Sequence, residues 1–292
     1  MENTVVGIGE ILWDVYPNGK VLGGAPANFV YHVSQFGFNG YAVSAVGKDI
    51  LGNEIADSLN KKELKCILQK TSEPTGTVQV TIDNNGEPHY EICKNVAWDN
   101  LTFNDELKQL AKRTNTICFG SLAQRNSVSA KAIGVFLDYL PTDALKIFDI
   151  NLRQDFYNKK LIDSSLNRCN ILKINNEELV TIAELFGWVR MNEMEICDTL
   201  IKNYSLKILI LTKGVNGSYV MTHTEKSFKQ TPEVQVVDTV GAGDSFTAAF
   251  VAALLKKKSI SEAHQLAVDV AAFVCTQKGA MPFLPDSIIE RV

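Results

Sequence analysis

The sequence contains little that would direct the chain to a membrane or out of the cell. Its longest uncharged apolar stretch, residues 245–255, has only eleven residues, whereas a bilayer-spanning helix needs about 20. Residues 1–6 carry neither a basic segment nor a sustained apolar one, so no secretory signal is predicted. We therefore expect a cytoplasmic protein that has no membrane partner.

Paired cysteines and an excess of basic charge are also missing. The six cysteines form no C-x-x-C pair, and the four histidines are dispersed. This spacing predicts reduced packing cysteines and argues against a structural zinc site. The formal net charge of −4 argues against nucleic acid as the main partner, because nothing balances a phosphate backbone. The rest is ordinary globular composition, 46% hydrophobic and 21% charged over 292 residues.

Predicted strands and helices alternate along most of the chain. The alternation predicts an α/β fold whose mostly parallel sheet is covered by helices on both faces. No linker or repeat interrupts it, so we expect a single domain over residues 1–292. The expected strands are 4–11, 41–46, 117–120, 145–150, 171–174 and 207–212, and the expected helices are 26–36, 51–62, 129–140, 177–186, 193–204, one from Asp244, and 260–277.

One segment departs from this alternation. Residues 77–82 alternate in the strand period, residues 83–86 (Asp-Asn-Asn-Gly) form a turn signal, and residues 88–93 can return as the second strand of a hairpin. A hairpin with one polar face, placed between strand–helix units, predicts a small sheet separate from the main one. Such a sheet could act as a lid.

The most distinctive local motif is DTVGAGDSF, residues 238–246. Two glycines separated by alanine lead directly into an apolar helix, whose free first-turn amides would attract an anion. Asp244, at the same helix start, would lie beside a bound phosphate and within reach of an attacking hydroxyl. The structural alternative is a tight turn with Asp244 as the helix cap.

A second glycine-rich helix start occurs near the amino terminus, at GGAPAN, residues 23–28. Asn28 has both a donor and an acceptor, which suits vicinal sugar hydroxyls. The alternative is an ordinary helix start with Asn28 exposed. No Walker A motif is present, and Gly7-Ile8-Gly9 lacks the third glycine of a dinucleotide fingerprint.

The two motifs together, with Gly37 after the first, resemble the two signatures of the ribokinase-like (PfkB) sugar kinases in order and separation. The resemblance covers essentially the whole chain. It implies a three-layer α/β/α fold with a small β-sheet lid built from segments near 12–22 and 75–97. It also implies an enzyme that uses ATP and Mg²⁺, with Asp244 as catalytic base and an anion hole formed by Gly241, Ala242 and Gly243.

The same resemblance assigns further site residues. Asn175, followed two and three residues later by Glu177 and Glu178, could instead only cap a helix whose acids face solvent. Val240 stands where many relatives have a second threonine, which removes one hydroxyl from a loop that often holds K⁺. The implied sets are Asp14, Gly23, Gly24, Asn28, Asp149 and Arg153 for the sugar, Asn175, Thr212, Gly214, Gly217, Ala271 and Cys275 for the nucleotide, Glu178 for Mg²⁺ through water, and Asp238 for a monovalent cation.

The acceptor is suggested by residues 149–153, DINLR, just past a predicted strand. This motif looks most like the fructokinase and 2-keto-3-deoxygluconate kinase branches. Arg153 could bind a sugar hydroxyl or the transferring phosphoryl group, or it could pair with Asp149 or Asp155. We expect conversion of fructose to fructose 6-phosphate. The alternatives are a 2-keto-3-deoxygluconate kinase, another sugar or nucleoside kinase, a non-catalytic sensor, or a protein–protein scaffold. The lid also implies a homodimer, although loops could cap its edges instead.

Overall fold

The computed structural model describes residues 3–82 and 88–292. Its main sheet has the strand order β13-β12-β11-β10-β9-β8-β1-β4-β5. All neighbours pair in parallel except β12 with β11 and β13 with β12, which confirms the mostly parallel sheet. The strands are β1 (Thr4–Ile8), β4 (Asn39–Gly47), β5 (Cys66–Thr71), β8 (Thr114–Phe119), β9 (Leu145–Asp149), β10 (Ile171–Asn175), β11 (Ile208–Thr212), β12 (Ser218–Met221) and β13 (Lys226–Lys229).

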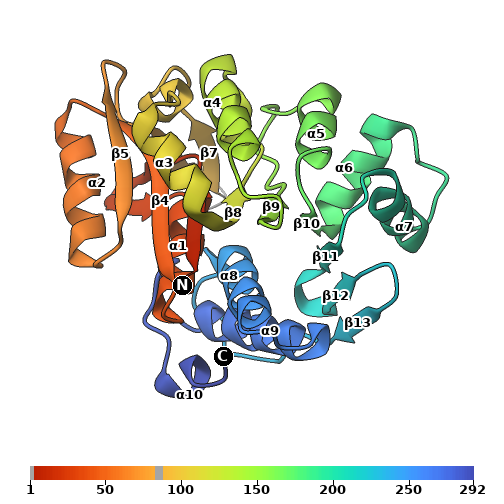
Figure 1. Cartoon of the computed structure of the whole chain (residues 1–292). Coiled ribbons are helices and arrows are strands. Elements are labelled where there is room, and N and C mark those ends of the chain that lie inside the picture. The colour runs from red at the N-terminus through yellow and green to blue at the C-terminus, as the bar shows by residue number, and fades with distance from the viewer. Residues whose placement is uncertain (1–2, 83–87) are drawn as a thin grey trace.

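Helices cover both faces of this sheet (Figure 1). One face carries α1 (Ala25–Gln35), α2 (Ile50–Lys61), α8 (Ala242–Leu255) and α9 (Ile260–Cys275). The other carries α3 (Asp105–Arg113), α4 (Ser127–Asp138), α5 (Lys159–Leu166), α6 (Asn176–Phe186) and α7 (Glu193–Asn203). A short α10 (Asp286–Ile289) lies near the carboxyl terminus, and 3-10 turns span Ala97–Asn100 (η1), Leu122–Gln124 (η2) and Gly214–Asn216 (η3).

The pleat of the strands divides the apolar core into two clusters. Val5 packs on the face covered by α1, α2, α8 and α9, and its neighbour Val6 packs on the opposite face. The same alternation holds in β8, where Cys118 and Phe119 belong to different clusters. Because successive strand residues point to opposite faces, a strand covered on both sides is a continuous apolar run.

A second, four-stranded sheet has the order β3-β2-β6-β7. It consists of β2 (Leu12–Tyr16), β3 (Gly19–Gly23), β6 (Thr77–Ile82) and β7 (Pro88–Ile92), so the predicted separate small sheet is confirmed. The turn predicted at 83–86 falls within 83–87, outside the described residues. Arg125 joins the end of this sheet to the main domain, because it donates to both carboxylate oxygens of Asp99 and to the carbonyl of Cys93.

The first strand is shorter than predicted, since β1 ends at Ile8 and not at residue 11. Gly9 has a φ of 154°, a backbone conformation that favours glycine, and there the chain leaves the sheet towards β2. In the described part of the chain, no helix combines the length and the apolar character that a membrane span requires.

Candidate active site

The start of α8 is an open helix end. Gly241 occupies the N-cap position with φ 79°, and no side chain caps the helix. A Cβ at this position would lie 2.6 Å from the side chain of Ala280 and 2.7 Å from its Cα, so both conformation and space require glycine. Within the described residues the amides of Gly243 and Asp244 have no acceptor, and that of Ala242 reaches only Thr239 O at 3.3 Å. The predicted anion hole therefore has free donors.

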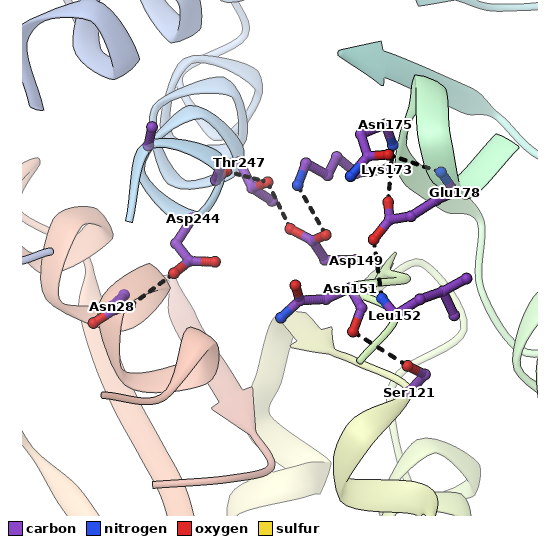
Figure 2. Close-up of polar contacts among 12 residues, drawn as sticks. Asn28, Ser121, Asp149, Asn151, Leu152, Lys173, Asn175, Glu178, Asp244 and Thr247 are labelled. Atoms are coloured by element: carbon purple, nitrogen blue, oxygen red, sulfur yellow. Dashed lines mark hydrogen bonds and ion pairs between the residues drawn. The ribbon is translucent and has the colours of Figure 1, made fainter. Parts of the chain in front are cut away.

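Asp244 lies at the edge of this open end and is linked to α1. Its Oδ2 accepts a hydrogen bond from Asn28 Nδ2 at 2.8 Å (Figure 2). Burial, and next the negative charge of Asp149, raise the pKa of Asp244 to about 6. The Asn28 hydrogen bond and the positive charges of Lys173 and Arg153 act in the opposite direction. A carboxylate with a pKa close to neutral is well suited to accept a proton from an alcohol.

Asn28 is buried, so the alternative interpretation of Asn28 as an exposed residue at an ordinary helix start is wrong. Its Nδ2 is used by Asp244, while its Oδ1 is buried and finds no donor among residues 3–82 and 88–292. Gly24 lets the chain turn into α1 at this point, since it has φ 129° and a Cβ there would meet Glu10 O at 2.6 Å. Asn28 thus presents a buried, unsatisfied acceptor beside Asp244, as a hydroxyl-binding residue would.

Asp14 lies on β2 of the small sheet, next to Gly23 of β3. A Cβ at Gly23 would lie 2.6 Å from Asp14 Oδ2, so the glycine makes room for this carboxylate. Burial raises the pKa of Asp14 to about 6, and the charge of Arg153 lowers it in part. Arg153 lowers the pKa of Asp244 in the same way, so the arginine lies close to both predicted site carboxylates.

Arg153 is placed by an irregular loop that follows β9. Asn151 and Gln154 have left-handed φ angles of 43° and 48°, which is uncommon for residues other than glycine. Leu152 N donates to Glu178 Oε1 at 2.9 Å and holds the loop against α6. The side chain of Arg153 is exposed and bonds only to the carbonyl of Leu152 among the described residues. The guanidinium is therefore available to a ligand, and no pairing with Asp149 or Asp155 is present.

Asp149, predicted to contact the sugar, has both carboxylate oxygens engaged by protein partners. Its Oδ1 accepts from Lys173 Nζ at 3.0 Å and its Oδ2 from Thr247 Oγ1 at 3.2 Å (Figure 2). A Cβ on Gly243 would lie 2.9 Å from Lys173 Nζ. The network therefore holds a buried ammonium group against the anion hole. Asp149 therefore positions Lys173, and its role as a sugar ligand stays a prediction.

Asn175 and Glu178 form a capping box at the start of α6. Asn175 Oδ1 accepts from Glu178 N at 2.8 Å, and Glu178 Oε2 accepts from Asn175 N at 2.9 Å. The capping alternative for Asn175 is therefore present in the structure. Glu178 is buried, not on a solvated face, and burial raises its pKa while Lys173 opposes the shift.

The described residues contain no group of three or more His, Cys, Asp or Glu side chains that could hold a metal ion directly. Mg²⁺ in phosphoryl transfer needs only one or two carboxylates besides phosphates and water. Each Glu178 oxygen accepts a single amide bond and keeps a lone pair for water. The site therefore fits Mg²⁺ held through water and phosphate.

Four of the six residues predicted for the nucleotide lie at the turn after β11 or beside it: Asn175, Thr212, Gly214 and Gly217. Thr212 pairs with Asn175 across β10 and β11, and Gly214 and Gly217 adopt positive φ in the η3 turn. Thr231 Oγ1 donates to Gly214 O, and the amide of Val237 donates to Cys275 O of α9, the helix that also carries Ala271. This region exposes apolar side chains suited to a flat base: Val215, Val234, Val236, Val237 and Val240.

Asp238 joins two segments at the base of α8. Its Oδ1 accepts from Val240 N and its Oδ2 from Gly279 N, both at 3.0 Å. The carboxylate fixes the loop that leads to the open helix end. Its role as a ligand of a monovalent cation stays a prediction.

Three site residues were missed by sequence reasoning: Glu10, Lys173 and Thr247. Lys173 carried a detectable signal, because it is a charged residue inside the otherwise apolar strand Ile-Leu-Lys-Ile, residues 171–174. Thr247 carried none, since its contact with Asp149 spans 98 residues. Glu10 lies in the segment Glu-Ile-Leu-Trp-Asp, residues 10–14, which looks fructokinase-like, but that resemblance assigned it no role.

An acid beside an open anion hole, with unsatisfied acceptors around it, is the arrangement that a phosphotransferase with an alcohol acceptor needs. The pfkB family carbohydrate kinase model matches residues 15–287, and the chain belongs to this family. In an alignment of 319 positions, gaps included, it is 28% identical to the probable fructokinase-5 of Arabidopsis thaliana. The alignment covers 98% of this chain and 96% of that protein.

Solved structures share the ribokinase-like fold. Fructokinase from Xylella fastidiosa with bound ATP superposes with a TM-score of 0.83 at 20% identity, covering 100% of this chain and 98% of that one. A double mutant of Vibrio cholerae fructokinase, with fructose, ADP and potassium bound, gives 0.82 at 19% identity, covering 99% and 98%. The predicted fold and enzyme class are thus confirmed, and the chain is a fructokinase-like sugar kinase.

Proposed function

We propose that this protein transfers the γ-phosphate of ATP to the primary hydroxyl of fructose and forms fructose 6-phosphate. The observation that best supports phosphoryl transfer is the position of the Asp244 carboxylate at a helix start whose amides, those of Gly243 and Asp244, have no acceptor among the described residues. The fructokinase-like relatives support fructose as the acceptor.

The sugar would lie between the small sheet and the start of α8, against Asp14, Asn28 and Arg153. Asp244 accepts the proton of the primary hydroxyl as its oxygen attacks the γ-phosphorus. The open amides of α8 stabilise the charge that develops on the transferring group. Lys173, held by Asp149 directly behind Gly243, adds positive charge at the same point.

The nucleotide would lie along the ends of β10 and β11, with its base against the exposed valines and α9. Glu178 would hold Mg²⁺ through water, and the ion neutralises phosphate charge when it is bound. Closure of the small sheet over the sugar would exclude water, which suppresses hydrolysis of ATP. Asp238 remains the candidate ligand for K⁺, and rates compared in K⁺ and tetramethylammonium would test it.

Arg153 supports one alternative acceptor. An exposed guanidinium with no acidic partner among the described residues suits the carboxylate of an acidic sugar such as 2-keto-3-deoxygluconate. Fructose has no carboxylate. With fructose, the Arg153 guanidinium would bind a sugar hydroxyl or the transferring phosphoryl group instead.

Purified protein assayed with ATP and a sugar panel tests the proposal. The panel contains fructose, ribose, tagatose, 2-keto-3-deoxygluconate and adenosine, with ADP release as readout. The highest kcat/KM is expected for fructose. A preference for another acceptor would overturn the fructose assignment, and no sugar-dependent ADP release would favour the sensor. The lid-mediated homodimer also stays a proposal, which light scattering on the purified protein would test.

A further inference from the structure

Glu10 is a buried acid at the end of the central strand. It follows Gly9, directly after β1, which lies between β4 and β8 in the main sheet. The residue is only 4% exposed. Ligands of open α/β sheets bind outside the carboxyl ends of the strands, so an acid at this point lies on the functional edge of the sheet.

One oxygen of this carboxyl group is unsatisfied. Glu10 Oε2 is buried and finds no donor in residues 3–82 and 88–292. The side chain lines a small hollow together with Ala25, Asn151 and Asp244. A buried carboxylate oxygen without a donor is costly, and a native structure that retains one usually has a use for it.

The surroundings leave the carboxyl group able to accept or to donate. The pKa of Glu10 is raised to about 7, mainly by burial and to a lesser extent by the negative charge of Asp244. The backbone amides of Glu10 and Ala25 and the charge of Arg153 lower it in part. Near neutral pH both protonation states are populated, so the group can pair with either end of a hydroxyl dipole.

The hollow is too small for more than one polar group. Its volume is about 10 Å³, close to the minimum for a single water molecule. Asp244 also lines this hollow, so an acceptor whose primary hydroxyl meets Asp244 would bring another of its hydroxyls close to Glu10. Asn28, whose Oδ1 is also unsatisfied, flanks Asp244 from α1.

We propose that Glu10 is a specificity-determining residue whose free oxygen binds one further hydroxyl of the sugar, besides the hydroxyl that is phosphorylated. This inference rests on the proposed sugar kinase activity and deepens it. Because a pocket built to bond a hydroxyl leaves its polar group unpaired when the hydroxyl is missing, it rejects the deoxy analogue. A purely structural role, such as holding the start of α1 through Ala25, would affect all acceptors alike.

The test compares acceptors that each lack one hydroxyl. Wild-type protein, Glu10→Leu and Glu10→Gln are assayed with fructose and with its 1-deoxy, 3-deoxy and 4-deoxy analogues. In the wild type, one analogue is expected to lose about 10- to 100-fold in kcat/KM, as for a hydrogen bond to a charged group. In Glu10→Leu that single penalty is expected to fall to about 3-fold or less, while the other penalties persist. Glu10→Gln, which keeps the shape and hydrogen-bonding capacity, is expected to be intermediate.

An unchanged set of penalties, or an equal loss for every acceptor, would overturn the inference. Asp49→Asn is the control for a general loss of stability, because Asp49 caps the start of α2 at Gly52 and is not among the site residues. It is expected to lower the melting temperature without altering the pattern of penalties. If Glu10→Leu does not fold, Glu10→Gln provides the test. In this variant the kcat/KM penalty must still shrink for the analogue that is penalised in the wild type, and for no other analogue. Wild-type inactivity towards every sugar would refute the proposed function itself, a different outcome from an unchanged pattern.

Discussion

Helices α6 and α8 each have an acidic residue at their third position, but only one of the two acids caps its own helix. Glu178 is the third residue of α6 and turns back to cap its own helix together with Asn175. Asp244 is the third residue of α8, where the cap is Gly241 and no side chain occupies the helix end. The cap of α6 occupies amides at its helix start, whereas, within the part of the chain that the structure describes, the uncapped start of α8 leaves its first amides free for a ligand.

The same division extends over the described helices of eight residues or more. Only α1 and α8 lack a side-chain cap, and both have glycine at the N-cap. These two helices supply Asn28 and Asp244, which bond to each other. The other helices are capped by Asp49, Asn104, Asn126, Asn158, Asn175, Asn192 and Ser259. An absent cap therefore marks the site better than any single residue type does.

The largest expected effect comes from removing the acid of the open start. Asp244→Asn keeps the shape and the bond to Asn28 but cannot accept the proton. We expect kcat to fall by at least about 100-fold, the low end for a positioned base, while ATP binding survives. Steady-state assays and calorimetric titration with ATP measure the two quantities. A variant with kcat near wild type would exclude Asp244 as the base.

The next effect tests whether the glycine cap itself matters. Gly241→Ala adds left-handed strain and a clash with the backbone of Ala280, so it displaces the anion hole. We expect a loss of at least about 10-fold in kcat/KM, because misplaced donors stabilise the transition state poorly. The matched control is Gly187→Ala at the end of α6, which has φ 77° and open space around its Cβ position. It should cost about 1 to 2 kcal/mol of stability, the strain of a left-handed residue with a Cβ, and leave kcat/KM unchanged. Equal kinetic losses in the two variants would contradict the role of Gly241.

Much of the fold could be predicted because its central strands are buried on both faces. The apolar runs at 117–120, 145–150, 171–174 and 207–212 correspond to β8, β9, β10 and β11. Elements at the edges were missed. In the edge strand β5 the residues are mostly half-buried, β13 is the short strand at the other edge, and β12 is the short antiparallel strand beside it. Helix α3 was also missed, since only Leu107, Leu110 and Ala111 are buried in an otherwise polar segment.

The site was predictable to the extent that it depends on local motifs. The open start of α8 and the position of Asn28 follow from glycine-rich sequences that each lie within a few residues. The contact between Lys173 and Asp149 spans 24 residues, and that between Thr247 and Asp149 spans 98. Such pairings depend on how the strands align, so the sequence could not show that Asp149 accepts a hydrogen bond from Lys173.

A smaller effect concerns the bond between the two uncapped helices. Asp244 must be charged to accept a proton, so kcat/KM should rise with pH through about 6, the pKa that burial gives this group. The Asn28 hydrogen bond favours the charged form and lowers that pKa. Asn28→Ala should therefore move the rising limb to higher pH. Profiles of kcat/KM between pH 5 and 8 measure the shift, and a limb that moves to lower pH would contradict the proposed coupling.

The smallest effect tests the closed start of α6. Asn175→Ala and Asn192→Ala each remove the side chain of a capping box, on α6 and α7, so each should cost about 1 kcal/mol of stability. Asn175 also lies beside Thr212 in the proposed nucleotide region, whereas Asn192 is not among the site residues. If Asn175 contacts the nucleotide as well as capping, KM for ATP should rise in Asn175→Ala only. Thermal unfolding and ATP kinetics on both variants separate the roles, because a shared stability loss with unchanged KM would make Asn175 a cap alone.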